Sequence, residues 1–187
     1  MAEPDAAAAA DRPDVAAHQE VVLAARERQD AVRALAALSG NAHKGSDNSR
    51  VRFELEKKIA QLTEKHKGAV DAVGPGGRTP LLTVCTQGAV DDVAALLALG
   101  ADPAKEGDVF SISDSEEKYK YTPLLLAARD GRMEMVRVLL VHERVDVNQA
   151  SSDVGRTALR FACAEGHTEL VGLLLAHAGI DAKKAKS

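Results

Sequence analysis

Apolar residues recur at helical spacing along the chain, first in two long segments and then in three shorter segments that resemble one another. Between residues 14 and 39 they fall near one helical face, and Gly40 ends the segment. A second helix is predicted from about residue 50 to 67, with apolar residues four and three apart at Leu55, Ile59 and Leu62. Together the two segments predict an N-terminal helical hairpin over residues 14–70.

The hairpin has two interpretations. Its apolar stripe covers the end of the next domain, or it forms a short coiled coil through which two copies dimerise. The 4-3 spacing suits a coiled coil but lasts barely two heptads. Basic residues of the second helix alternate with glutamates, which favours a solvated face over a phosphate-binding one.

The three shorter segments share one pattern. Each begins at a threonine, at positions 79, 122 and 157, and has a glycine nine residues later and a leucine pair near its end. In "YTPLLLAARDG", Thr122 can accept the free N–H groups of a first turn, Pro123 suits the first helical position, and Gly131 can take the left-handed conformation that ends a helix. Helices this short are unstable alone in water, so the copies must stack.

These residues resemble the ankyrin repeat, whose pattern has a Thr-Pro-Leu-His opening, paired alanines, a Gly-His turn and a Val…Leu-Leu second helix. The resemblance covers roughly residues 74–181, with copies at about 77–103, 120–149 and 155–181. It implies an all-α solenoid of helix-turn-helix repeats with β-turn or hairpin fingers, here preceded by the N-terminal hairpin. Residues 1–13 are predicted to be a disordered leader, and residues 182–187 a short basic tail.

The chain departs from the family pattern at several positions. The family's histidine, which ties neighbouring turns together, is replaced by Leu82, Leu125 and Arg160, so a looser stack is expected. Ala158 replaces proline and predicts a weaker helix start in the third copy. The resemblance also places Cys85 and Cys163 in a column of small, closely packed residues, which implies inert, buried thiols and no redox role.

One repeat spacing is too long. The threonines lie 43 and 35 residues apart, against a family period of about 33. The excess predicts an insertion of about ten residues in the finger at 104–120. Three roles stay open for it: a neutral surface extension, a loop that contacts a partner, or a phosphorylation switch at Ser111, Ser113 and Ser115, which stand among acidic residues.

Composition narrows the range of functions. The 187 residues are 45% hydrophobic but only 3% aromatic, which favours thin, helix-rich layers. A net charge of −4 gives no basic field for nucleic acid, and no apolar run is long enough to span a membrane. Without a secretory signal, an intracellular location in the cytoplasm or nucleus is expected. We find no pattern typical of catalysis, phosphate binding or metal ligation, so neither enzyme activity nor a cofactor is expected.

The resemblance implies a protein-binding adaptor that uses the concave face of the stack. Carried over column by column, the contact candidates are Arg78, Thr86, Gln87, Tyr119, Tyr121, Arg129, Asp130, Arg156, Ala164 and Glu165. Among them Tyr121, Arg129 and Arg156 are the strongest, because Tyr and Arg dominate interface energetics. The alternative is a self-associating scaffold such as a homodimer, or a fragment of a longer array, that uses the hairpin or the apolar edge of the last repeat.

Overall fold

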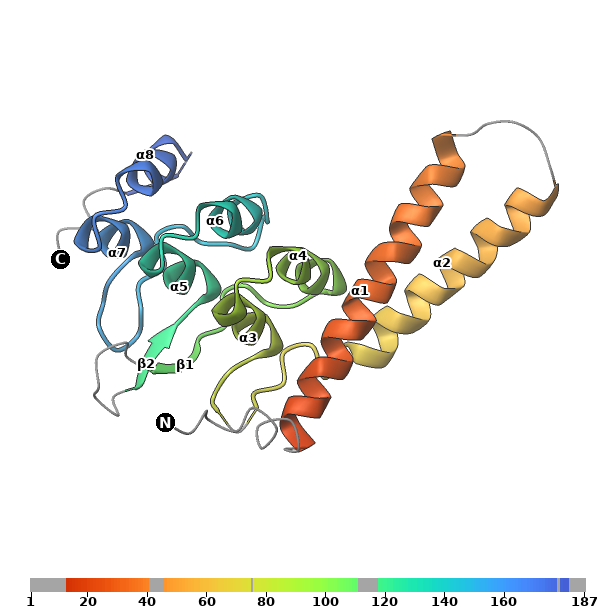
Figure 1. The fold of residues 1–187 in the computed structure, drawn as a ribbon, viewed down its shortest axis with the longest axis horizontal. Helices are drawn as coiled ribbons and strands as arrows, with labels where there is room; N and C mark the ends of the chain where they lie inside the picture. Colours follow the sequence, from red (N-terminus) through yellow and green to blue (C-terminus); the bar gives the residue numbers. More distant parts are fainter. Residues whose placement is uncertain (1–12, 41–45, 75, 111–117, 178, 182–187) are drawn as a thin grey trace, which may run out of the picture.

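The computed structural model describes residues 13–40, 46–74, 76–110, 118–177 and 179–181. Two long helices, α1 (Pro13–Gly40) and α2 (Ser46–His66), lie at one end of the molecule (Figure 1). Three short helix pairs follow side by side in chain order. They are α3 (Pro80–Gln87) with α4 (Val90–Leu99), α5 (Pro123–Arg129) with α6 (Met133–Leu140), and α7 (Ala158–Ala164) with α8 (Thr168–Ala176).

The first helix of each pair begins and ends in the same way. The hydroxyl oxygens of Thr79, Thr122 and Thr157 accept hydrogen bonds from the N–H groups three residues on, over 3.2, 3.3 and 3.4 Å. Glycines at 88, 131 and 166 have φ angles of 79°, 67° and 74°, a left-handed conformation that side chains disfavour. The threonine starts and glycine ends predicted from the sequence are therefore confirmed. In the third pair, α7 begins at the equivalent position although Ala158 replaces the proline.

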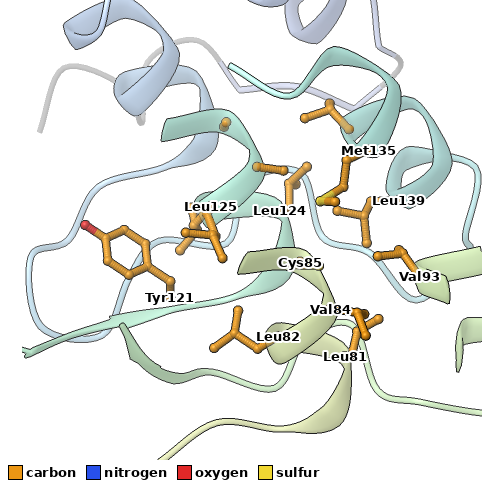
Figure 2. Packing of buried hydrophobic residues seen from close by; sticks show 14 of the residues in the cluster. Leu81, Leu82, Val84, Cys85, Val93, Tyr121, Leu124, Leu125, Met135 and Leu139 are labelled. Carbon is orange, nitrogen blue, oxygen red and sulfur yellow. The ribbon is translucent and has the colours of Figure 1, made fainter. Parts of the chain in front are cut away.

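The helix pairs share one apolar core. The second helix of each pair contributes a leucine to it at the same position of the repeat. Leu96, Leu139 and Leu174 are each fully buried. Figure 2 shows buried apolar side chains of the first two pairs, with Leu81 and Leu82 of α3 and Leu124 and Leu125 of α5 in one cluster. Such small apolar layers suit a chain with few aromatic residues.

Helix α1 packs across the first helix pair. Val21 and Ala25 are buried in the shared core, and α1 contacts both α3 and α4. Both guanidinium nitrogens of Arg26 that face α4 donate over 2.5 Å to the carboxylate of Asp92, whose side chain is only 5% exposed. Helix α2 packs on α1, and salt bridges such as Lys65 to Glu20 (3.2 Å) link them. In the described residues from 32 to 65, no side chain of α1 or α2 is fully buried.

The inserted finger forms a small antiparallel sheet of strands β1 (Gly107–Phe110) and β2 (Lys118–Tyr121), with Gly107 opposite Tyr121. Of the β-turn or hairpin fingers that the resemblance implies, this one is a hairpin, in a fold that is mostly helical. Val109 in β1 and the alternating Tyr119 and Tyr121 in β2 suit an extended, half-buried conformation. The proposed phosphorylation sites Ser111, Ser113 and Ser115 lie outside the described residues.

The two cysteines, although they share a column of the repeat, differ in environment. Cys85 is buried, and this burial raises the pKa of its thiol to about 12, against the opposing influence of Arg132. Cys163 is exposed, so the expectation of a buried thiol is wrong for that residue. Helix α5 covers Cys85, whereas no described element lies beyond α7 to cover Cys163.

Candidate functional site

A groove of about 540 Å³ crosses the repeats between the inserted finger and the turns that follow the first helices. We call it the repeat groove. Its walls come from all three repeats and from β1. The lining residues are Arg78, Thr86, Val109, Leu126, Arg129, Asp130, Arg132, Glu165 and His167.

Charged side chains at the end of α5 form a network in the groove. The Asp130 carboxylate accepts a hydrogen bond from Arg129 Nε (2.8 Å) and lies 3.4 Å from Arg132 Nη2. The Arg129 guanidinium also lies 4.8 Å from the centroid of the Tyr121 ring. Burial lowers the pKa of Arg129, but hydrogen bonds to Asp130 and Tyr121 outweigh it and raise that pKa overall. The network fixes three polar side chains at the groove before any partner binds.

Two groove residues tie neighbouring repeats together. Arg132 donates to the carbonyl oxygens of Cys85 (2.5 Å) and Thr86 (3.1 Å), at the end of α3. His167 Nε2 lies 2.9 Å from the Arg129 carbonyl, and because a carbonyl only accepts, this nitrogen carries the proton. Arg132 and His167 are equivalent, since each follows the glycine of its turn.

These bonds link neighbouring repeats, although the family histidine that led us to expect a looser stack is replaced. Leu82 and Leu125, which replace the family histidine, are buried at 0% and 1% exposure and pack in the core. The polar link comes instead from the residue after each turn glycine, at a position that the sequence analysis did not consider for this role. In the first repeat that position is Ala89, and the neighbouring α1 is held by Arg26 and Asp92.

The wall of the groove at the first repeat depends on a close contact with β1. Arg78 Nε donates to the Asp108 carbonyl over 2.9 Å, and the Asp108 carboxylate pairs with Lys120 at 2.6 Å. Gly77 has φ 73°, and a Cβ atom there would collide with the Asp108 carboxylate. Glycine is therefore required where the chain passes beneath the finger.

The inserted finger is also held by the turn between the second and third repeats. The Asp153 carboxylate accepts a hydrogen bond from the Lys120 backbone N–H (2.6 Å), and Ser151 Oγ is within hydrogen-bond distance of that carboxylate. Burial raises the pKa of Asp153, but the bonds from Ser151 and from backbone N–H groups, including that of Lys120, outweigh it and lower the pKa overall. Glu106 accepts from the Ser152 N–H over 2.9 Å. The finger is thus fixed at its base.

The structure brings five of the contact candidates together in the repeat groove: Arg78, Thr86, Arg129, Asp130 and Glu165. Among the others, Gln87, Arg156 and Ala164 are exposed and Tyr119 is half-buried against the core. The groove also contains residues that the sequence analysis missed, namely Val109, Leu126, Arg132 and His167. His167 and Arg132 had a sequence signal, because they follow the repeated glycine.

Tyr121 departs from its expected place as a contact residue. It is only 5% exposed, and its ring lies 5.3 Å from that of Phe161. The last residue of β2 turns inward here because the finger returns to the start of α5, next to Phe161 of α7. Arg156 lies over the other aromatic residue, 5.9 Å from the centroid of Phe161. Tyr121 therefore supports the groove from below and has little surface to offer a partner.

In the part of the chain that the structure describes, no group of three His, Cys, Asp or Glu side chains is placed to hold a metal ion. None of the helices described there is both long and apolar enough to cross a membrane.

Comparison with known proteins identifies the repeats. Residues 104–186 match the family model for ankyrin repeats (3 copies). This part of the chain belongs to the ankyrin repeat family. The sequence-based recognition is thereby confirmed, and the first helix pair, which precedes the matched residues, has the same threonine start and glycine end. No curated protein matches the chain.

A solved structure supports the ankyrin fold. The chain is similar to the crystal structure of EF0377, an ankyrin repeat protein, with 31% sequence identity and a TM-score of 0.51. The similarity covers 67% of this chain and 57% of that one, so this chain spans little more than half the length of its structural relative. Ankyrin repeats are in general protein–protein interaction modules, and this family is typically non-catalytic.

Proposed function

We propose that the protein is a non-catalytic adaptor whose stacked ankyrin repeats form a solenoid, and that it binds a protein partner in the repeat groove on the concave side. The observation that carries this proposal is the clustering of five contact candidates from three repeats around one groove. Residues far apart in sequence meet there, as a binding surface built across repeats requires.

The chemistry of the groove suits a protein partner. Leu126 and Val109 line the bottom of the groove, but they are only 1% and 5% exposed, so they shape it and offer a partner little apolar surface. The polar side chains of Arg129 and Asp130 are 12% and 16% exposed and are already held by their mutual hydrogen bond. A fixed pair loses little further conformational freedom on binding. Directed polar groups of this kind supply the hydrogen bonds of a protein interface.

Two exposed residues at or beside the groove give the means of testing it without damaging the fold. Glu165 lines the groove and Gln87 directly follows the lining residue Thr86; the two occupy equivalent positions at the ends of α7 and α3. Gln87→Glu introduces a charge there and Glu165→Lys reverses one. Together, as the rim variant, they change the surface charge at the groove but remove no buried contact. Glu143→Lys, in the exposed turn after α6, is a matched control outside the groove.

The test is quantitative capture from cell lysate with wild-type protein, the Gln87→Glu/Glu165→Lys variant and the Glu143→Lys control. Circular dichroism first verifies that all three have the same helix content. We expect a specific protein to bind the wild type and the control but to be lost with the rim variant. If the same proteins bind all three equally, the repeat groove is not the binding site.

A further inference from the structure

A second groove lies between helix α1 and the first repeat. We call it the hairpin groove, and its volume is about 540 Å³. Residues of α1 between positions 26 and 33 form one wall, and residues 88–92, from the turn into α4, form the other. Arg26 and Asp92 join the two walls through two hydrogen bonds of 2.5 Å. The hairpin groove is therefore built jointly by the N-terminal hairpin and the repeats.

The hairpin groove adjoins the repeat groove at the turn between α3 and α4. Thr86 lines the repeat groove, and Gly88, two residues later, lines the hairpin groove. Arg132 lies at the boundary, because it donates to the Thr86 carbonyl and because a Cβ atom at Gly88 would lie 3.0 Å from its Nη1. A polypeptide segment that lies in the repeat groove can thus continue past this turn into the hairpin groove.

The hairpin groove has an excess of negative charge. Its charged residues are three aspartates and two arginines, namely Asp30, Asp91, Asp92, Arg26 and Arg33. Arg26 binds Asp92, and Arg33 lies 3.8 Å from Asp30. Asp91 is exposed, and its carboxylate has no salt-bridge partner in the part of the chain that the structure describes. A basic side chain of a partner is the complement of this charge.

The adjoining end of the repeat groove has the opposite charge. Arg129 and Arg132 share one carboxylate, that of Asp130. Arg132 also donates to two backbone carbonyl oxygens, which carry no net charge. Two neighbouring grooves of opposite charge favour a segment that is acidic in one part and basic in the next, because charge complementarity determines specificity and register at an interface.

We propose that the partner's binding segment continues from the repeat groove into the hairpin groove and places a basic side chain beside Asp91. This inference rests on the proposed function, because one segment fills both grooves. An acidic side chain of the segment lies near Arg132, and a lysine or arginine a few residues along it reaches Asp91. Helix α1 is then part of the binding surface as well as the cap of the stack.

The probe for this proposal is a phage-displayed library of random peptides of about 16 residues, which span about 50 Å when extended. The library is selected on the full-length wild-type protein, and enriched peptides are synthesised with a fluorescent label. Their dissociation constants are then measured by fluorescence anisotropy. We expect the enriched sequences to contain an acidic residue and, a few residues away, a lysine or arginine.

The variant Asp91→Lys reverses the charge that the proposal assigns to the contact. We expect it to weaken binding of the enriched peptides about fivefold, because a solvent-exposed ion pair is replaced by a repulsion. A peptide whose basic residue is replaced by glutamate should show the reverse preference and bind Asp91→Lys more tightly than the wild type. Glu143→Lys makes the same change of charge outside both grooves and should bind as the wild type does.

A second variant covers an effect of Asp91 on the fold. Asp91 lies in the first turn of α4, where a negative charge also stabilises the helix. Asp91→Asn removes the charge but introduces no repulsion, and we expect it to weaken binding about twofold. Circular dichroism verifies that each variant keeps the helix content of the wild type, and Asp91→Asn replaces Asp91→Lys in the comparison if the latter does not.

The rim variant distinguishes failure of this inference from failure of the proposed function. If the rim variant binds the enriched peptides more weakly but the Asp91 variants bind them as the wild type does, the segment ends in the repeat groove. That result refutes this inference and leaves the proposed function intact. If the rim variant binds the peptides as the wild type does, or if no peptide is enriched, both proposals are contradicted.

Discussion

Replacement of Arg132 tests whether side-chain ties between repeats stabilise the stack. Arg132→Ala removes two hydrogen bonds from a charged donor, at 2.5 and 3.1 Å, to carbonyl oxygens at the end of α3. A hydrogen bond from a charged group contributes about 1.5–3 kcal/mol, and a neutral one about 0.5–1.5 kcal/mol. The Arg132 side chain is 31% exposed, so solvent screens its charge, and we take the range of a neutral hydrogen bond for each of the two bonds. We expect a loss of about 1–3 kcal/mol in the free energy of unfolding.

The assay is urea unfolding followed by circular dichroism at 222 nm. Arg132→Lys keeps the charge but cannot bridge two carbonyls with one planar group, so an intermediate loss is expected. Arg137→Ala on α6, the helix that Arg132 precedes, is the control, because the Arg137 side chain forms an exposed salt bridge with Glu134 at 3.6 Å. Its loss should stay within about 0.5 kcal/mol. If Arg132→Ala unfolds at the same urea concentration as Arg137→Ala, the inter-repeat bonds contribute no stability and the reasoning is refuted.

Three further predictions concern the core, the N-terminal cap and the finger. Tyr121→Ala should lose about 3–5 kcal/mol of unfolding free energy because it empties a buried aromatic site, whereas Tyr121→Phe should lose less than about 1.5 kcal/mol; equal losses would contradict its packing role. Arg26→Ala should lower the melting temperature more than Asp92→Asn does, because only the former leaves a buried carboxylate unpaired, and the reverse order would refute this. The pKa of Asp153 is lowered in the folded state, so its contribution to stability is present at neutral pH and is lost as pH falls below about 4. The stability difference between wild type and Asp153→Asn, measured by urea unfolding, should shrink between pH 5 and pH 3, and a constant difference would contradict the assigned contacts.

The local signals in the sequence predicted the repeats well. A threonine start, an apolar run and a glycine at a fixed distance depend only on the backbone of one helix, so they can be read without a partner. Thr122 and Gly131 behave as their chemistry requires. The break in the repeat spacing likewise located the inserted finger, which is a two-stranded hairpin.

The residues whose environment was not predicted from the sequence all depend on contacts between repeats. Tyr121 resembles a surface residue in sequence, but Phe161 of the next repeat lies against its ring. Cys163 shares its column with a buried cysteine, yet burial in that column comes from the following helix pair. Arg132 bonds to carbonyls of a helix 46 and 47 residues earlier in the chain. Such contacts depend on how the repeats stack, which the pattern of one repeat does not contain.

Site-specific photo-crosslinking tests binding in the repeat groove most directly. A benzophenone amino acid is placed at Gln87, which directly follows the groove residue Thr86, and in a separate protein at Glu143; both positions are exposed. Each protein is irradiated in cell lysate, and the crosslinked proteins are identified by mass spectrometry. We predict that one defined protein is crosslinked from position 87 and not from position 143. Crosslinks to the same proteins from both positions, or specific crosslinks from position 143 alone, would contradict a partner bound in the groove.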